Sequence, residues 1–283
     1  MRVVVASGKG GTGKTTIATS IATLAATEGA RVTYVDCDVE EPNGHLFLRP
    51  DIRGSSEVEV PVPVVDDKTC TRCGACSAAC QFNALACLRT GVVIFAELCH
   101  GCGACSIVCP ADAIVETTRP VGKLTWGDAD DVGFLSGTMS VGEASAVPVI
   151  RALKERVHED GLYVLDSPPG TACPAVETMR EADALVLVTE PTPFGLNDLK
   201  LAVDAAREIG LSPGVVINKA GLGDDRINTY CSSEGLPVLA EIPNSPEVAR
   251  ACAAGRVPLN EVPAFKSAVF DLYRAVVAHA RSV

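Results

Sequence analysis

Short apolar runs recur along the chain, separated by polar residues and by glycine or proline. Such runs, rich in β-branched residues, are found at residues 1–5, 31–36, 163–166, 184–188 and 215–218. Strands buried on both faces of a parallel sheet have this nearly continuous apolar character. Between the runs, apolar residues recur at helical spacing, as at residues 17–25 before Gly29 and at residues 197–209 before Gly210. The pattern predicts an α/β fold with a mostly parallel sheet flanked by helices.

The middle of the chain interrupts this pattern. Residues 60–63 read Val-Pro-Val-Pro, a cysteine-rich stretch follows, and Arg119-Pro120 closes the segment before the apolar runs resume. A change of composition inside a continuing pattern indicates an insertion rather than an appended domain. We therefore predict a discontinuous α/β domain formed by residues 1–57 and 121–283, with a small α+β domain inserted at residues 58–120.

The inserted segment contains an internal repeat. The spacing C-x2-C-x2-C-x3-C occurs at Cys70, Cys73, Cys76 and Cys80 and again, 29 residues later, at Cys99, Cys102, Cys105 and Cys109. This is the spacing of bacterial ferredoxins, in which the fourth cysteine of each motif ligates the other cluster. It predicts one [4Fe–4S] cluster held by Cys70, Cys73, Cys76 and Cys109, and another held by Cys99, Cys102, Cys105 and Cys80. Zinc is disfavoured, because zinc sites usually use four ligands in two pairs.

A glycine-rich segment follows the first predicted strand and begins the first predicted helix. It consists of Gly8, Lys9, Gly10, Gly11, Thr12, Gly13, Lys14, Thr15 and Thr16. In a P-loop, successive backbone N–H groups converge on phosphate oxygens at a helix N-terminus. The motif predicts that Lys14 contacts the β- and γ-phosphates and that the Thr15 hydroxyl ligates Mg²⁺.

The position of Lys9 distinguishes this segment from an ordinary P-loop. A lysine just after the first glycine resembles the deviant Walker A motif of the MinD/ParA/Mrp class of ATPases, which includes the nitrogenase iron protein. The resemblance implies that Lys9 crosses a dimer interface and contacts the nucleotide of the other subunit, as an arginine finger does. A solvated surface lysine is the alternative.

Other segments agree with the same class. Residues 35–38 resemble its second motif, which implies that Asp36 holds a magnesium-bound water and that Asp38 orients the attacking water. Residues 41–43 resemble its first switch. Residues 164–171 resemble its Walker B strand and second switch, with Asp166 in the outer magnesium shell. By resemblance, the catalytic residues are Lys9, Lys14 and Asp38.

Two further residues indicate which nucleotide base is bound. Asn218-Lys219-Ala220-Gly221 resembles the motif with which GTPases read guanine, but Gly221 replaces the aspartate. Asn218 after a strand, with Pro243 later, fits the adenine-binding version of the class. We expect ATP rather than GTP.

Five cysteines lie outside the two repeated motifs. We expect Cys37, Cys87, Cys231 and Cys252 to be small packed side chains. Cys173 lies in the second switch, and a switch cysteine of the nitrogenase iron protein ligates a cluster that bridges two subunits. A bridging site at Cys173 is therefore one hypothesis, against a packed or merely exposed thiol.

Charge and composition exclude several classes of protein. The 35 acidic and 24 basic residues give a net charge of −11, which disfavours binding to nucleic acid. No apolar run approaches the ~20 residues that span a bilayer, and the chain opens directly into a strand. We therefore expect a cytoplasmic protein with no membrane partner. The apolar stripe at Phe265, Val269, Leu272, Val276 and Val277 has few positive charges beside it, which favours a core helix over a membrane anchor.

Together these features predict a Mg²⁺-dependent ATPase, slow without a partner, that forms a homodimer with ATP and carries two [4Fe–4S] clusters. The switch segments would move the cluster domain toward an unidentified redox or iron–sulfur client protein. The task would be ATP-gated electron transfer or the assembly of iron–sulfur clusters or metallocofactors. The alternative is a MinD/ParA-like spatial organiser with ATP-dependent attachment to a surface.

Overall fold

The computed structural model describes residues 1–158 and 160–281. Within them, a nine-stranded sheet has the order β11-β10-β9-β1-β8-β2-β7-β6-β3. Its strands are β1 (Arg2–Ala6), β2 (Val32–Asp36), β3 (Asp51–Val65), β6 (Ile114–Ala129), β7 (Val132–Met139), β8 (Leu162–Asp166), β9 (Ala184–Thr189), β10 (Gly214–Ala220) and β11 (Val238–Pro243). Neighbouring strands from β11 to β7 are parallel, and β6 and β3 are added antiparallel at one edge. The prediction of a mostly parallel α/β sheet is confirmed.

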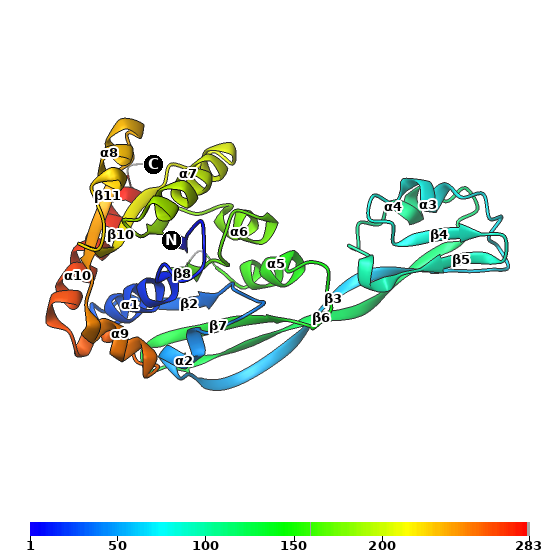
Figure 1. Ribbon diagram of the computed structural model, residues 1–283. Helices are drawn as coiled ribbons and strands as arrows, with labels where there is room; N and C mark the ends of the chain where they lie inside the picture. The colour runs from blue at the N-terminus through cyan, green and yellow to red at the C-terminus, as the bar shows by residue number, and fades with distance from the viewer. Residues whose placement is uncertain (159, 282–283) are drawn as a thin grey trace.

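Helices cover both faces of the sheet (Figure 1). α1 (Lys14–Thr27) and α10 (Pro263–Ala280) pack on one face, and α5 (Val147–Glu155), α6 (Cys173–Met179), α7 (Pro193–Glu208) and α8 (Arg226–Glu234) pack on the other. Alternate residues of one strand pack into the two hydrophobic cores, one on each face of the sheet. Val3 and Val5 of β1 lie in the core beneath α1, whereas Val4 lies in the opposite core, where α6 contacts β1. Two-sided burial explains why the central strands read as continuous apolar runs.

The C-terminal helix α10 belongs to the core. Phe265, Val269, Leu272 and Val276 are buried, and Val277 is half-buried. The apolar stripe is therefore covered by the sheet and α1, as predicted for a core helix. Among the described residues, the helices are all too short or too polar to cross a membrane.

One predicted helix boundary is wrong. α7 begins at Pro193 rather than Asn197. The Thr192 hydroxyl accepts a hydrogen bond from the Gly195 backbone N–H at 3.0 Å and so caps the helix. Proline suits the first helical position because that residue needs no N–H partner. Helical apolar spacing alone shows only the part of a helix that packs on the core, so it missed this first turn.

The two edge strands β3 and β6 form a long antiparallel ribbon. Their register runs from Asp51 opposite Asp128 to Val65 opposite Ile114. The ribbon carries residues 66–113 away from the helix-covered sheet (Figure 1). The predicted boundaries at residues 57/58 and 120/121 fall inside these paired strands, so secondary structure is continuous across them. The division of the chain into two domains stays a prediction.

Residues 66–113 form a small unit built from two similar halves. Its elements are α3 (Ala75–Ala79), β4 (Leu85–Leu88), β5 (Gly91–Ile94), η1 (Ala96–Leu98) and α4 (Ala104–Ile107). Positive φ angles occur at three pairs of positions that are 29 residues apart, namely 72/101, 74/103 and 83/112. The same offset relates the hydrogen bonds from Ala84 N to Cys80 Sγ and from Ala113 N to Cys109 Sγ, both 3.3 Å. The sequence repeat is thus also a repeat of backbone conformation.

Two leucines of α7 test where the core lies. Leu199 is 2% exposed and Leu201 is 52% exposed. Leu199→Ala should lower the free energy of unfolding by about 2–5 kcal/mol because it leaves a cavity. Leu201→Ala, on the same helix, should lower it by less than about 1 kcal/mol. Urea unfolding followed by circular dichroism measures both, and equal losses would contradict this assignment of the core.

Candidate functional site

The glycines of the loop between β1 and α1 serve two purposes. Gly11 and Gly13 have φ angles of +78° and +94°, in the left-handed region that favours glycine. A Cβ atom on Gly8 would lie 2.1 Å from the backbone oxygen of Asp198 in α7, so this position has no room for a side chain. A Cβ atom on Gly10 would meet nothing within 4 Å. The loop is therefore enclosed by protein at Gly8 and open at Gly10.

Lys14, the first residue of α1, lies beside acidic residues at the ends of two neighbouring strands. Asp36 ends β2, Asp166 ends β8, and the two residues are opposite each other in the register of these strands. Lys14, Asp36 and Asp166 are 7%, 0% and 1% exposed. Burial lowers the pKa of Lys14 below its ordinary value, and the charges of Asp166 and Asp38 act against this. The structure thus brings four predicted site residues together.

Negative charge exceeds positive charge in this cluster. Burial raises the pKa of Asp36 well above its ordinary value, and the charge of Asp166 acts in the same direction. Burial also raises the pKa of Asp166, opposed by the Thr15 hydroxyl and the charge of Lys14. Burial, followed by the charge of Asp166, raises the pKa of Asp38 to about 6. A divalent cation at this place would relieve the repulsion among the carboxylates.

Hydrogen bonds hold the two strand-end carboxylates. The Gly44 backbone N–H donates to Asp36 Oδ2 at 2.8 Å, and the Tyr34 hydroxyl donates to Asp166 Oδ2 at 2.9 Å. Asp166 Oδ1 and Thr12 Oγ1 are buried and have no hydrogen-bond partner among the described residues. Buried polar atoms normally find a partner, so these two atoms fit a site that receives a polar ligand.

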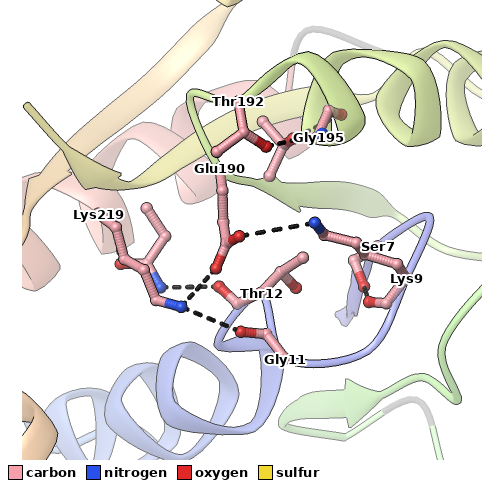
Figure 2. Close-up of polar contacts among 10 residues, drawn as sticks. Ser7, Lys9, Gly11, Thr12, Glu190, Thr192, Gly195 and Lys219 are labelled. Carbon is pink, nitrogen blue, oxygen red and sulfur yellow. Dashed lines mark hydrogen bonds and ion pairs between the residues drawn. The ribbon is translucent and has the colours of Figure 1, made fainter. Parts of the chain in front are cut away.

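Lys9 lies on the other side of the loop and is held within its own chain (Figure 2). Its Nζ is 3.7 Å from Glu190 Oε2, where Glu190 directly follows β9. Lys219 Nζ contacts the other oxygen of Glu190 and donates to the Gly11 carbonyl oxygen at 3.3 Å. Lys9 is therefore not simply a solvated lysine. Its predicted contact across a dimer interface stays a prediction.

The residues predicted to read the base lie at the same edge of the sheet. The Asn218 side-chain amide donates to the Thr12 carbonyl oxygen at 2.7 Å, and its Oδ1 accepts from the Lys219 backbone N–H at 2.9 Å. Pro243 ends β11 and pairs with Ala220 of β10. The Asn218 side chain is thus hydrogen-bonded directly to the backbone of the P-loop. Adenine contacts for Asn218 and Pro243 stay predictions.

Thr15 and Thr16 point to different surroundings. The Thr15 hydroxyl is placed so that it lowers the pKa of the Asp166 carboxyl group. Thr16 Oγ1 lies 3.5 Å from Cys252 Sγ in α9 (Pro246–Ala253). The structure therefore places Thr15, but not Thr16, on the carboxylate side of the loop.

Two cavities in the 66–113 unit are each lined by four cysteines. Cys70, Cys73, Cys76 and Cys109 line one small cavity. Cys80, Cys99, Cys102 and Cys105 line the other. In each case the fourth cysteine comes from the other motif. The fold therefore gathers the cysteines into the two sets that the crossed ligation predicts.

The cysteines remain free thiols, with no disulfide among the described residues. The Ala75 backbone N–H and the Thr71 side chain lower the pKa of Cys73, which favours its thiolate. Within residues 1–158 and 160–281, no three His, Cys, Asp or Glu side chains gather as they would around one metal ion. The ligation of clusters in these cavities therefore stays a prediction.

The other cysteines divide by exposure. Cys37 and Cys231 are buried, as expected for packed side chains, whereas Cys87 and Cys252 are half-buried. Cys173, the first residue of α6, is exposed. A packed role for Cys173 is therefore wrong, and the choice between a bridging ligand and an exposed thiol stays open.

Comparison with known proteins identifies the family. Residues 3–259 match the family described as the CobQ/CobB/MinD/ParA nucleotide binding domain. The chain belongs to this family of P-loop proteins.

Relatives of known sequence span most of the chain. An uncharacterized protein of Methanocaldococcus jannaschii is 33% identical over 231 residues, which cover 79% of this chain and 80% of that protein. An uncharacterized ATP-binding protein of the same organism is 25% identical, with coverage of 92% and 91%. The iron–sulfur cluster carrier protein of Rickettsia typhi is 24% identical, but the match covers 88% of this chain and only 63% of that protein.

Solved structures share the fold. The septum site-determining protein MinD from Pyrococcus horikoshii, complexed with Mg-ADP, has a TM-score of 0.62 at 18% identity and covers 97% of this chain and 95% of its own. A nucleotide-binding protein from Archaeoglobus fulgidus in complex with ADP has a TM-score of 0.54 at 19% identity, with coverage of 94% and 91%. At these identities the likeness is one of fold.

Sequence reasoning missed three residues of the site. Glu190 and Tyr34 each contact a predicted site residue, and Lys219 contacts both Glu190 and the loop at Gly11. Glu190 carried one available signal, because it directly follows an apolar strand at the edge where ligands bind in open α/β sheets. Tyr34, inside a buried strand, carried no local signal beyond its hydroxyl.

Two glycines of the loop should respond differently to the same change. Gly8→Ala should lower the free energy of unfolding, because its Cβ would overlap the Asp198 backbone. Gly10→Ala should leave the free energy of unfolding within about 1 kcal/mol of the original but weaken binding of a fluorescent ADP, because phosphate must approach the backbone there. Urea unfolding and fluorescence titration separate the effects. ADP binding unchanged by Gly10→Ala would argue against a phosphate site at this loop.

Proposed function

We propose that this protein is an ATP-hydrolysing dimeric switch that acts on two [4Fe–4S] clusters held in residues 58–120. The observation that carries the proposal is the pairing of a family P-loop with two four-cysteine cavities on one continuous chain. The cytoplasm, where thiols stay reduced, is the compartment that suits it.

The nucleotide half of the proposal rests on the loop and the buried acidic cluster. ATP would bind with its phosphates on the backbone N–H groups from Gly10 to Thr15 and on the Lys14 ammonium. Thr15, Asp36 and Asp166 would hold Mg²⁺, which neutralises phosphate charge. Asp38 would orient the attacking water, and Lys9 of a second copy would approach the transferred phosphoryl group. The ADP complexes of the two fold relatives support a nucleotide here.

The iron–sulfur half rests on the grouping of the eight cysteines. The four thiolates of a [4Fe–4S] cluster bond four different irons, so they surround a group rather than gather about one ion. Four free thiols surround each of the two cavities, three from one motif and the fourth from the other, which is the arrangement that a cluster requires. Backbone N–H donors to Cys80 and Cys109 Sγ add the hydrogen bonds that stabilise thiolates. The iron–sulfur carrier relative supports the same chemistry.

A route of contacts joins the two halves. Asp38 and Pro168, in the two switch segments, line one groove together with Val141 and Gly142. The next residue, Glu143, accepts hydrogen bonds from Nη1 and Nη2 of Arg119 on β6, at 2.5 and 2.8 Å.

From Arg119 the route reaches the cysteine unit. Arg119 Nε donates to the Ala96 carbonyl oxygen at 3.0 Å, three residues before Cys99. A rearrangement of the switch segments could therefore reach a cysteine cavity through adjoining contacts.

The spatial organiser remains the second candidate, favoured by the MinD fold relatives. The burial of the α10 stripe and the net charge of −11 favour the cluster switch, because an organiser needs an exposed apolar or basic surface.

Iron content tests the iron–sulfur half of the proposal. Purified without oxygen, the protein should be brown and contain about eight irons per chain. Cys80→Ala should lose about four irons and the signal of one cluster. The cluster held by Cys70, Cys73, Cys76 and Cys109 should be retained. Cys87→Ala is the matched control, since Cys87 lines neither cavity, and it should retain all the iron. Zinc in place of iron would refute the cluster half.

Nucleotide dependence separates the two candidate functions. With Asp38→Ala to slow hydrolysis, ATP and Mg²⁺ should give a dimer, and Lys9→Ala in that background should stay monomeric. The same ATP-bound dimer should show a shifted cluster potential by electron paramagnetic resonance titration and should capture a client in an anaerobic pull-down. Co-sedimentation with liposomes or DNA only when ATP is present, with an unshifted potential, would instead establish the organiser.

A further inference from the structure

We propose that Glu190 is a positioning residue that restrains Lys9 in the nucleotide-free chain and thereby opposes dimer formation until a bound nucleotide draws Lys9 away. The proposal rests on the ATP-dependent dimer proposed above and concerns what holds Lys9 before that dimer forms. Lys9 would leave Glu190 when a second copy of this chain docks with its bound nucleotide.

Glu190 stands between two ammonium groups at the end of β9 (Figure 2). Its side chain is 14% exposed, so the carboxylate is largely removed from water. Oε1 contacts Lys219 Nζ, and Oε2 is 3.7 Å from Lys9 Nζ. A carboxylate this buried requires a cationic partner, and the structure gives it two.

The two lysines are held unequally. Lys219 Nζ also donates to the Gly11 carbonyl oxygen at 3.3 Å, so it is fixed at two points. Lys9 has Glu190 as its only ion-pair partner within the described residues, at the longer distance, and its side chain is 33% exposed. The Ser7 hydroxyl donates to the Lys9 carbonyl oxygen at 2.5 Å, which holds the backbone in place. The Lys9 side chain can therefore leave Glu190 without moving the loop, and Lys219 remains to neutralise Glu190.

Release of Lys9 exchanges one ion pair for another. Leaving Glu190 loses a partly desolvated contact with a single negative charge, and reaching the nucleotide of a second copy gains a contact with its phosphates. A triphosphate presents more charge and extends further than a diphosphate, so the exchange favours the dimer with ATP and opposes it with ADP. Breaking the Lys9–Glu190 contact costs the same with either nucleotide, so Glu190 weakens both dimers. The ADP dimer, which gains less from its phosphates, is then the first to be lost as the protein is diluted.

The expected change in the dimer dissociation constant follows from the symmetry of the dimer. A single exposed or partly exposed ion pair is worth roughly a two- to fivefold change in an equilibrium constant. A two-fold symmetric dimer breaks the Lys9–Glu190 contact twice. Glu190→Gln, which removes the charge but keeps the shape, should therefore lower the dimer dissociation constant about 4- to 25-fold. The dimer constants with ADP and with the ATP analogue should fall by the same factor, because the contact that is lost is the same in both cases.

The experiment is sedimentation velocity with Mg²⁺ and either ADP or a non-hydrolysable ATP analogue. Glu190→Gln should dimerise more tightly, and Glu190→Asp should behave more like the original chain because it keeps the charge. Lys219→Gln should weaken the dimer, because Lys9 then becomes the cation that Glu190 requires. In a Lys9→Ala background, Glu190→Gln should have no effect. Titration with fluorescent ADP checks that each variant retains an intact loop.

Three outcomes would overturn the inference. An unchanged dimer constant for Glu190→Gln would show that Lys9 is not restrained. Equal effects of Glu190→Gln and Lys219→Gln would show that Glu190 acts only through the loop at Gly11. An original chain that stays monomeric with the ATP analogue would overturn the proposed switch as well, which distinguishes that failure from the other two.

Discussion

The structure depends on a concentration of buried negative charge at the carboxyl ends of β2 and β8. Asp36 and Asp166 are opposite each other in the sheet and almost fully buried, with Lys14 as the neighbouring cation. Burial, followed by the charge of Asp166, raises the pKa of Asp36, so holding carboxyl groups here costs free energy. Groups with pKa values perturbed in this way cluster at functional sites.

Much of this site could be predicted from the sequence, because consecutive residues carry its chemistry. The glycine loop, Lys14 and the strand-end aspartates each follow an apolar run, and the fold then brings them together. Glu190 and Lys219 were missed for a physical reason. Lys219 contacts the Gly11 carbonyl across 208 residues, and only the order of strands makes them neighbours. Tyr34 reaches Asp166 in the same way, across 132 residues.

The cysteine unit illustrates a different kind of predictability. A repeat of 29 residues in the sequence reappears as paired positive φ angles and paired N–H to sulfur hydrogen bonds. The crossing of the fourth cysteines into opposite cavities needs both halves folded together. The place of the unit at the end of a long ribbon was not predictable, because proline-containing segments such as residues 60–63 indicated a boundary where the strand in fact continues.

The ribbon of β3 and β6 limits how the cysteine unit can move. A flexible single-chain linker lets a module vary its distance from the body that carries it. Here two strands stay paired from Asp51–Asp128 to Val65–Ile114, with register shifts near Ile52 and Val58. Strands that hydrogen-bond to each other along their length cannot lengthen or shorten as a single flexible chain does. The ribbon therefore sets the separation between the cysteine unit and the helix-covered sheet.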